Sequence, residues 1–179
     1  MNRIFLIGYM GSGKTTVGKL LAARLGYTFI DLDAHIEEKQ FKSVSQIFAE
    51  QGEAKFRWLE QQSLHEVAEF DQVVISTGGG SPCYYDNMVY MNGQGVTVYL
   101  KLSPAELADR LEKSHANKRP LLAGRTGESL KQFISEALAT REPFYSQAAF
   151  TVSGEIEATV SQICVLTGFQ KIERNNRFE

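Results

Sequence analysis

The sequence predicts an α/β fold with three layers (α/β/α), in which helices cover both faces of a five-stranded parallel sheet. The chain has 179 residues, 43% of them apolar and 22% charged, which suits one globular domain with a substantial core. Short apolar runs alternate with stretches of helical periodicity, and strands that alternate with helices pair in parallel. Glycines and acids stand at the ends of several runs, where such sheets bind ligands.

The expected strands and helices follow one another along the chain. The strands are expected at residues 4–7, 27–32, 73–77, 95–102 and 150–152. Helices are expected behind the first strand, in a mostly helical region at about 34–70, after residue 103, at about 128–141 and at 156–166. Ser43 and Ser103 have the residue type of helix caps, and Pro143 is expected to lie beyond the end of its helix.

Nothing in the sequence divides the chain, so a single domain over residues 1–179 is expected. Residues 114–127 are polar and basic with two glycines, which predicts a mobile loop, and residues 171–179 form a polar tail.

Composition excludes several classes of partner. The formal charge of −2 and the pI near 6.0 give no basic field for nucleic acid, and no apolar run is long enough to predict a membrane span. The two cysteines lie far apart without metal-like spacing, which favours a reduced, cytoplasmic compartment. No feature demands a dimer, so a monomer is expected.

A phosphate-binding loop follows the first expected strand. Residues 8–15 read G-Y-M-G-S-G-K-T and match G-x-x-x-x-G-K-T, with a helical pattern directly behind them. The glycines let backbone N–H groups point at one phosphate, Lys14 brings positive charge to the outer phosphates, and the Thr15 hydroxyl can ligate Mg²⁺. The chain is therefore expected to bind a nucleoside triphosphate with Mg²⁺, in a P-loop architecture like that of nucleoside monophosphate kinases. The expected ATP contacts in this loop are Gly11, Ser12, Gly13, Lys14, Thr15 and Thr16.

Two acids follow the second expected strand. Asp31 and Asp33 are two residues apart, so they would face the same side if the strand continued through both. The third strand ends in Thr and Gly without an acid, which leaves Asp31 as the expected metal ligand by elimination. Asp33 is then free to hold a substrate hydroxyl and accept its proton. The alternative is that these acids cap the following helix, and Asp33 can do both.

Three consecutive glycines, Gly78 to Gly80, follow the third strand. Glycine permits positive φ and lets a ligand approach the backbone closely, and a simple strand exit seldom needs three in a row. A ligand-binding turn is therefore expected here.

Several motifs in order along the chain resemble those of shikimate kinases. Residues 52–60 read G-E-A-K-F-R-W-L-E and match the signature G-E-x-x-F-R-x-x-E of that family. The segments G-Y-M-G-S-G-K-T-T-V-G at 8–18, D-L-D at 31–33, T-G-G-G at 77–80, R-P-L-L at 119–122 and R-E-P-F-Y at 141–145 also fall in its order. The resemblance covers residues 3 to 167. Gln147 to Ala149 depart from it, because relatives often have acids there.

The resemblance implies a reaction and a site. It implies transfer of the γ-phosphoryl group of ATP to the 3-hydroxyl of shikimate, in the synthesis of chorismate and aromatic amino acids. A substrate-binding helical region is expected at about 33–62 and a lid at 114–127. Lys14, Asp33 and Arg119 are implied as catalytic, with Arg119 reaching from the lid to the ATP phosphates and Arg110 stacking on adenine. The implied shikimate contacts are Asp33, Arg57, Gly78, Gly79, Gly80 and Arg141.

The implied roles agree with the chemistry of the residues. Shikimate carries one carboxylate and three hydroxyls, and Arg57 with Arg141 can supply a cationic fork for the acid. Glu60 lies one helical turn after Arg57 and can hold its guanidinium. Phosphoryl transfer to gluconate or to a nucleoside monophosphate stays as an alternative, as does a non-catalytic module that binds nucleotide or shikimate. Phe48 and Phe56 can wall the substrate pocket, but aromatics at helical spacing are more often core, and they are not included in the expected site.

Overall fold

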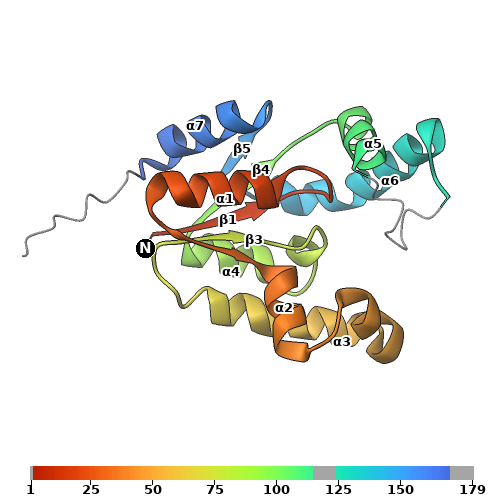
Figure 1. The fold of residues 1–179 in the computed structure, drawn as a ribbon, viewed down its shortest axis with the longest axis horizontal. Helices are drawn as coiled ribbons and strands as arrows, with labels where there is room; N and C mark the ends of the chain where they lie inside the picture. Colours follow the sequence, from red (N-terminus) through yellow and green to blue (C-terminus); the bar gives the residue numbers. More distant parts are fainter. Residues whose placement is uncertain (1, 115–123, 170–179) are drawn as a thin grey trace, which may run out of the picture.

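The computed structural model describes residues 2–114 and 124–169, and these form the α/β architecture that the sequence predicts (Figure 1). Five strands form one sheet in the order β2-β3-β1-β4-β5, and every neighbouring pair is parallel. The strands are β1 (Arg3–Ile7), β2 (Thr28–Asp31), β3 (Val73–Ser76), β4 (Val96–Leu100) and β5 (Phe150–Val152). The parallel five-stranded sheet is thereby confirmed.

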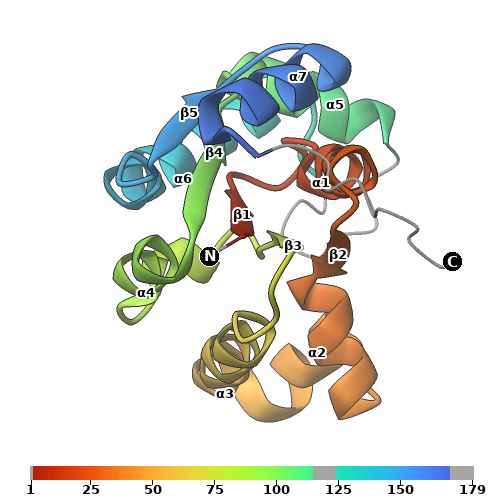
Figure 2. The ribbon, with the colours of Figure 1, turned by 90° about the vertical axis from the view of Figure 1, so that its left-hand side faces the viewer.

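Helices lie on both faces of the sheet (Figure 2). Helices α1 and α7 lie on one side of the strands, α4 and α6 lie on the other, and α2 and α3 pack together at the β2 side. Their bounds are α1 (Lys14–Leu25), α2 (Leu32–Gln40), α3 (Val44–Val67), α4 (Asn87–Gln94), α5 (Pro104–Lys113), α6 (Gly127–Tyr145) and α7 (Ile156–Thr167), with a short 3₁₀ helix η1 (Ser81–Cys83). Within the described ranges, no helix is both long and apolar enough to cross a membrane.

Two cores form on the two faces because successive strand side chains point to opposite sides. In β1, Ile4 and Leu6 join the core beneath α1 and α7, whereas Phe5 and Ile7 join the core that includes α3 and α4 residues. All four side chains are fully buried. This burial on both faces is what parallel strands between two helical layers require. The packing on both faces holds in place the strand ends that carry the phosphate loop and the acids.

Three local expectations are corrected by the structure. Helix α6 runs through Pro143 to Tyr145 instead of ending at Arg141, because burial of Tyr145 against the sheet outweighs the hydrogen bond that proline cannot donate. Strand β2 ends at Asp31, so Asp33 lies in the first turn of α2 and the two acids do not share a strand face. Helix α4 had no counterpart in the expected elements.

Helix α3 contains a break that matters for the site. Gly52 has φ 78° and ψ 170°, which interrupts the helix between an N-terminal segment capped by Ser43 and a longer segment that carries the arginine signature. A residue with a side chain is strained at such a φ, so glycine suits this position. The break sets the direction of the segment from Glu53 onward.

Candidate functional site

The phosphate loop connects β1 to α1 at the carboxyl edge of the sheet. Gly11 and Gly13 have φ of 82° and 95°, in the left-handed region that glycine adopts without strain. The Lys14 side chain is buried, and its Nζ donates to the carbonyl oxygens of Gly8 at 2.8 Å and Tyr9 at 3.0 Å. The loop therefore holds a buried ammonium beside the N-terminus of α1, an arrangement suited to binding phosphate.

The expected metal ligands are in direct contact. Thr15 Oγ1 donates to Asp31 Oδ2 at 2.9 Å, and Asp31 Oδ1 accepts from the backbone N–H of Ala34 at 3.4 Å as the cap of α2. The capping alternative is therefore correct for Asp31 and is compatible with metal binding through its other oxygen. A hydroxyl and a carboxylate suit Mg²⁺, which takes few protein ligands and completes its shell with phosphates and water. Across residues 2–114 and 124–169, no cluster of three or more His, Cys, Asp or Glu offers another metal site.

A cavity of about 510 Å³ opens over the phosphate loop, and we call it the phosphate-loop cavity. It brings together the loop, the end of β2 and the end of β3, as expected for a parallel sheet. Ser12 is the one expected ATP contact of the loop that does not line it. Its lining includes Gly11, Gly13, Lys14, Thr15, Thr16, Asp31, Asp33, Gly78 and Gly79.

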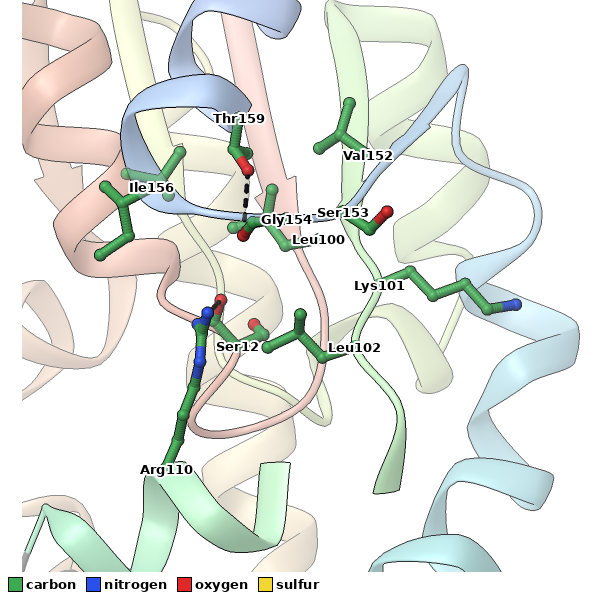
Figure 3. A pocket seen from close by; sticks show the side chains of 11 residues that line it. Ser12, Leu100, Lys101, Leu102, Arg110, Val152, Ser153, Gly154, Ile156 and Thr159 are labelled. Carbon is green, nitrogen blue, oxygen red and sulfur yellow. Dashed lines mark hydrogen bonds between the residues drawn. The ribbon is translucent and has the colours of Figure 1, made fainter. Parts of the chain in front are cut away.

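Ser12 instead lines a smaller pocket on the other side of the loop, together with Arg110 of α5 (Figure 3). Arg110 Nη1 donates to the Ser12 carbonyl oxygen at 3.3 Å. The far wall comes from Ser153 and Gly154, which follow β5, and from Ile156. No motif marked this wall, although the end of the last expected strand was a signal that could have located it.

A second cavity of about 340 Å³ lies beside the first, and we call it the arginine cavity. Arg57 of α3, Arg141 of α6 and the triple glycine line it, so the structure brings these distant segments together. Asp33 lines both cavities, as do Met10, Glu37, Gly78 and Gly79. The arrangement can hold an anionic ligand next to a nucleotide, with a carboxylate where the two would meet.

Two aromatic side chains that were assigned to the core also line the arginine cavity. Phe56 is 3% exposed, and its ring centroid lies 4.5 Å from that of the half-buried Phe48. Both line the cavity and also pack in the core, so they are core residues and pocket walls at once. Glu37 and Val44 line it as well, and no motif marked them; Met10, at a variable position of the phosphate-binding motif, also lines it.

Arg57 is held by carboxylates of its own helix. Its Nη1 donates to Glu60 Oε2 at 2.8 Å, which confirms the contact expected from their spacing. Its Nη2 donates to Glu53 Oε1 at 3.2 Å. The Glu60 side chain is 1% exposed, and its second oxygen, Oε1, has no hydrogen-bond partner within the described part of the chain. A guanidinium fixed in this way is preorganised for a planar carboxylate.

The triple glycine is required for space. Gly78 to Gly80 do not have positive φ. A Cβ at Gly80 would lie 2.7 Å from Arg57 Nη2, and one at Gly78 would lie 2.6 Å from Glu60 Oε1 and 3.0 Å from Asp33 Oδ1. The Gly79 carbonyl oxygen accepts from Arg141 Nη1 at 3.4 Å and from the Tyr145 hydroxyl. Close approach, and not an unusual backbone conformation, explains the three glycines.

The first prediction concerns Gly80. Replacing Gly80 with alanine is expected to push the flexible end of Arg57 aside and to raise the KM for the anionic substrate about tenfold, with ATP KM nearly unchanged. Gly93→Ala in α4 is the matched control, because a Cβ there meets nothing within 4 Å. It is expected to leave kinetics unchanged and to stabilise the fold by roughly 0.5–1 kcal/mol. Equal kinetics for the two variants would contradict this account of the turn.

Burial changes the acidity of two of the carboxyl groups that line the arginine cavity, those of Asp33 and Glu60. Desolvation raises the pKa of Asp33, the Asp31 carboxylate raises it further, and the Lys14 ammonium opposes both effects. Burial raises the pKa of Glu60 to about 7, although Arg57 favours its charged form. Carboxyl groups with perturbed acidity in a cavity are typical of functional sites.

The second prediction is a pH dependence of stability. Because the folded pKa of Glu60 is raised, its contribution is fully present below the unfolded pKa of 4.5 and is lost as pH rises toward 7. The free energy of unfolding is expected to fall by about 1–3 kcal/mol over that interval, relative to the Glu60→Gln variant, which does not titrate. Denaturant titrations of both proteins from pH 4.5 to 7.5 measure the difference. Parallel pH curves would show that Glu60 titrates normally.

The expected lid falls mostly outside the described part of the chain. Arg119 and the rest of residues 115–123 lie outside it, so its role stays a prediction.

Known proteins similar to this chain were identified by sequence and by structure. The sequence model of the shikimate kinase family ("SKI: Shikimate kinase") matches residues 10–167. A shikimate kinase of Parabacteroides distasonis is 57% identical, over 91% of this chain and 94% of the relative. The crystal structure of shikimate kinase from Bacteroides thetaiotaomicron has a TM-score of 0.88 at 49% identity, covering 92% of this chain and 97% of that one.

A third relative was solved with a ligand. Shikimate kinase from Acinetobacter baumannii, in complex with shikimate, has a TM-score of 0.83 at 32% identity and covers 93% of this chain and 92% of that one. The family match, the identities and the coverage agree over most of the sequence. The chain belongs to the shikimate kinase family.

Proposed function

We propose that this kinase transfers the γ-phosphoryl group of ATP to the 3-hydroxyl of shikimate at Asp33. The observation that carries the assignment is the position of Asp33, which lines both the phosphate-loop cavity and the arginine cavity. Glu37 lines both cavities too, but its carboxylate accepts from the backbone N–H of Val44 at 2.8 Å. A donor in the first cavity and an acceptor in the second would meet at its carboxylate. The complex of the Acinetobacter baumannii relative with shikimate supports the choice of acceptor.

The phosphate-loop cavity binds ATP. Lys14 moves from the loop carbonyls to the outer phosphates, and the N–H groups of the loop hold their oxygens. Thr15 and Asp31 hold Mg²⁺, which neutralises charge on the phosphates when bound. Adenine lies against Arg110, beside Ser153 and Gly154. Arg119 adds a further positive charge to the transferred group.

The arginine cavity binds shikimate. Arg57 and Arg141 bind its carboxylate through paired N–H donors, and Gly78 to Gly80 let the ring approach the backbone. Asp33 accepts a hydrogen bond from the 3-hydroxyl and takes its proton as the oxygen attacks the γ-phosphorus. The raised pKa of Asp33 makes it a better proton acceptor than an exposed aspartate.

The composition of the chain supports a proposal about its compartment and partners. We propose that it works as a cytoplasmic monomer of one domain, without nucleic acid or membrane as partners. The net charge of −2 and the two free cysteines, Cys83 and Cys164, support this setting.

The third prediction tests the cationic fork. Arg57→Ala is expected to raise the KM for shikimate about 10²-fold with a smaller change in ATP KM, because a charge-assisted pair worth about 1.5–3 kcal/mol is lost. The methyl ester of shikimate lacks the charge, so the native enzyme should prefer shikimate strongly, and Arg57→Ala should prefer it clearly less, because only Arg141 remains. Lys55→Ala is the control, because Lys55 is exposed on the same helix and lies over Trp58. An unchanged preference in Arg57→Ala would exclude this role.

A further inference from the structure

Two residues outside both cavities contact the outer edge of Arg57. Glu53 Oε1 accepts from Arg57 Nε at 3.3 Å and Nη2 at 3.2 Å, and it also accepts from the Tyr84 hydroxyl at 2.7 Å. The Tyr84 ring lies over the guanidinium, 4.2 Å from Arg57 Cζ. One carboxylate oxygen and one aromatic ring thus contact Arg57 from residues outside the arginine cavity.

The geometry leaves a defined part of Arg57 for the ligand. A guanidinium has five N–H donors. Glu53 takes one on Nε and one on Nη2, and Glu60 takes one on Nη1. One donor remains on each terminal nitrogen, and a Cβ at Gly80 in the cavity wall would lie 2.7 Å from Nη2 and 2.8 Å from Nη1. Paired donors on the terminal nitrogens are what a carboxylate binds.

We propose that Glu53 and Tyr84 form a positioning clamp, which holds Arg57 so that its Nη1–Nη2 end faces the carboxylate of shikimate. The proposal rests on the binding of shikimate by Arg57, which is proposed above. Neither clamp residue lines the arginine cavity, so both act through Arg57 and are not catalytic residues.

The clamp joins two segments that the fold brings together. Glu53 begins the second segment of α3 directly after the break at Gly52, and Tyr84 follows η1 behind the triple glycine. The Glu53 side chain is 54% exposed and that of Arg57 is 13% exposed. An exposed carboxylate contributes little by a charge pair alone, because both side chains lose freedom and water screens the pair. The Tyr84 hydroxyl fixes the carboxylate, and its ring restricts the guanidinium to one plane.

Steady-state kinetics of four variants test the clamp. Tyr84→Ala and Glu53→Ala are each expected to raise the KM for shikimate about fivefold, with kcat and ATP KM changed by less than about twofold. Tyr84→Phe keeps the ring and loses the hydroxyl, so about a twofold rise is expected. Adding Tyr84→Phe to Glu53→Ala should change nothing further, because the hydroxyl has lost its partner. A role in folding alone would not give this split between the two KM values or this non-additivity.

Tyr85→Ala is the matched control, since Tyr85 is 53% exposed and adjacent in sequence. A shikimate KM that stays constant or falls in Glu53→Ala would overturn the proposal, because a fall means that Glu53 competes with the substrate for Arg57. Additive effects in the double variant would overturn it too. If Tyr84→Ala does not fold, Tyr84→Phe and the double variant decide. If Arg57→Ala itself leaves the shikimate KM unchanged, the assignment of Arg57 to shikimate binding fails. If the shikimate KM is unchanged only in the clamp variants, the clamp is wrong and the role of Arg57 stands.

Discussion

Replacing Lys14 with alanine is expected to lower kcat by about 10²–10³-fold, because one preorganised positive donor to the developing charge is removed. The ammonium is already buried against the loop carbonyls, so ATP binding needs only a local move from carbonyl to phosphate oxygens. Its charge is worth more in such a site than in water. Activity and ATP binding are measured separately, by initial rates and by calorimetric titration of ATP.

Lys19→Ala supplies the control for Lys14, because Lys19 lies on the same helix but is exposed, whereas Lys14 is buried. Its kinetics are expected to stay native. A near-normal kcat in Lys14→Ala would contradict the role of the loop in phosphoryl transfer. A loss of folding in that variant would be visible by circular dichroism, and Lys14→Met, which keeps the length of the side chain, then serves in its place.

Asp33→Asn is expected to have the second large effect, a fall in kcat of about 10²–10⁴-fold, the range of a general base. The amide keeps the shape and can still hold a hydroxyl, but it cannot take the proton. In the native enzyme, kcat/KM should fall as pH drops through the raised pKa of Asp33, because its protonated form cannot act as a base. The acidic limb of the pH profile should disappear from the residual activity of the variant.

Glu38→Gln is the control for Asp33, since Glu38 is an exposed carboxylate on the same helix. If Asp33→Asn loses less than about tenfold in kcat, Asp33 orients the hydroxyl and does not remove its proton.

The sequence was sufficient where a local pattern has one physical solution. The phosphate loop requires its glycines, its lysine and a strand and helix around it, so its position at the carboxyl edge followed directly. Buried strands read as short apolar runs, and parallel order follows from the helices between them. The contact of Glu60 with Arg57 was predictable from helical spacing alone.

The sequence was insufficient where tertiary packing decides. Pro143 lies inside α6 because burial of Tyr145 favours continuation of the helix past the proline. The local preference of proline for helix ends does not include this tertiary contact. The triple glycine is explained by side chains that arrive from α2 and α3, so its spatial reason was invisible in the sequence. Phe48 packs in the core and also lines the arginine cavity. The second role depends on where the cavity lies, which helical spacing in the sequence does not reveal.

A coupled assay decides whether Asp33 stands between an ATP site and a shikimate site. Purified protein is given ATP and Mg²⁺ with shikimate, gluconate or a nucleoside monophosphate, and ADP release is measured in a coupled assay. The position of the phosphate on the product is read by NMR. The account predicts turnover that depends on shikimate and on Mg²⁺, with phosphate on the 3-hydroxyl. Absence of turnover with shikimate, together with good turnover on gluconate or a nucleoside monophosphate, would contradict it.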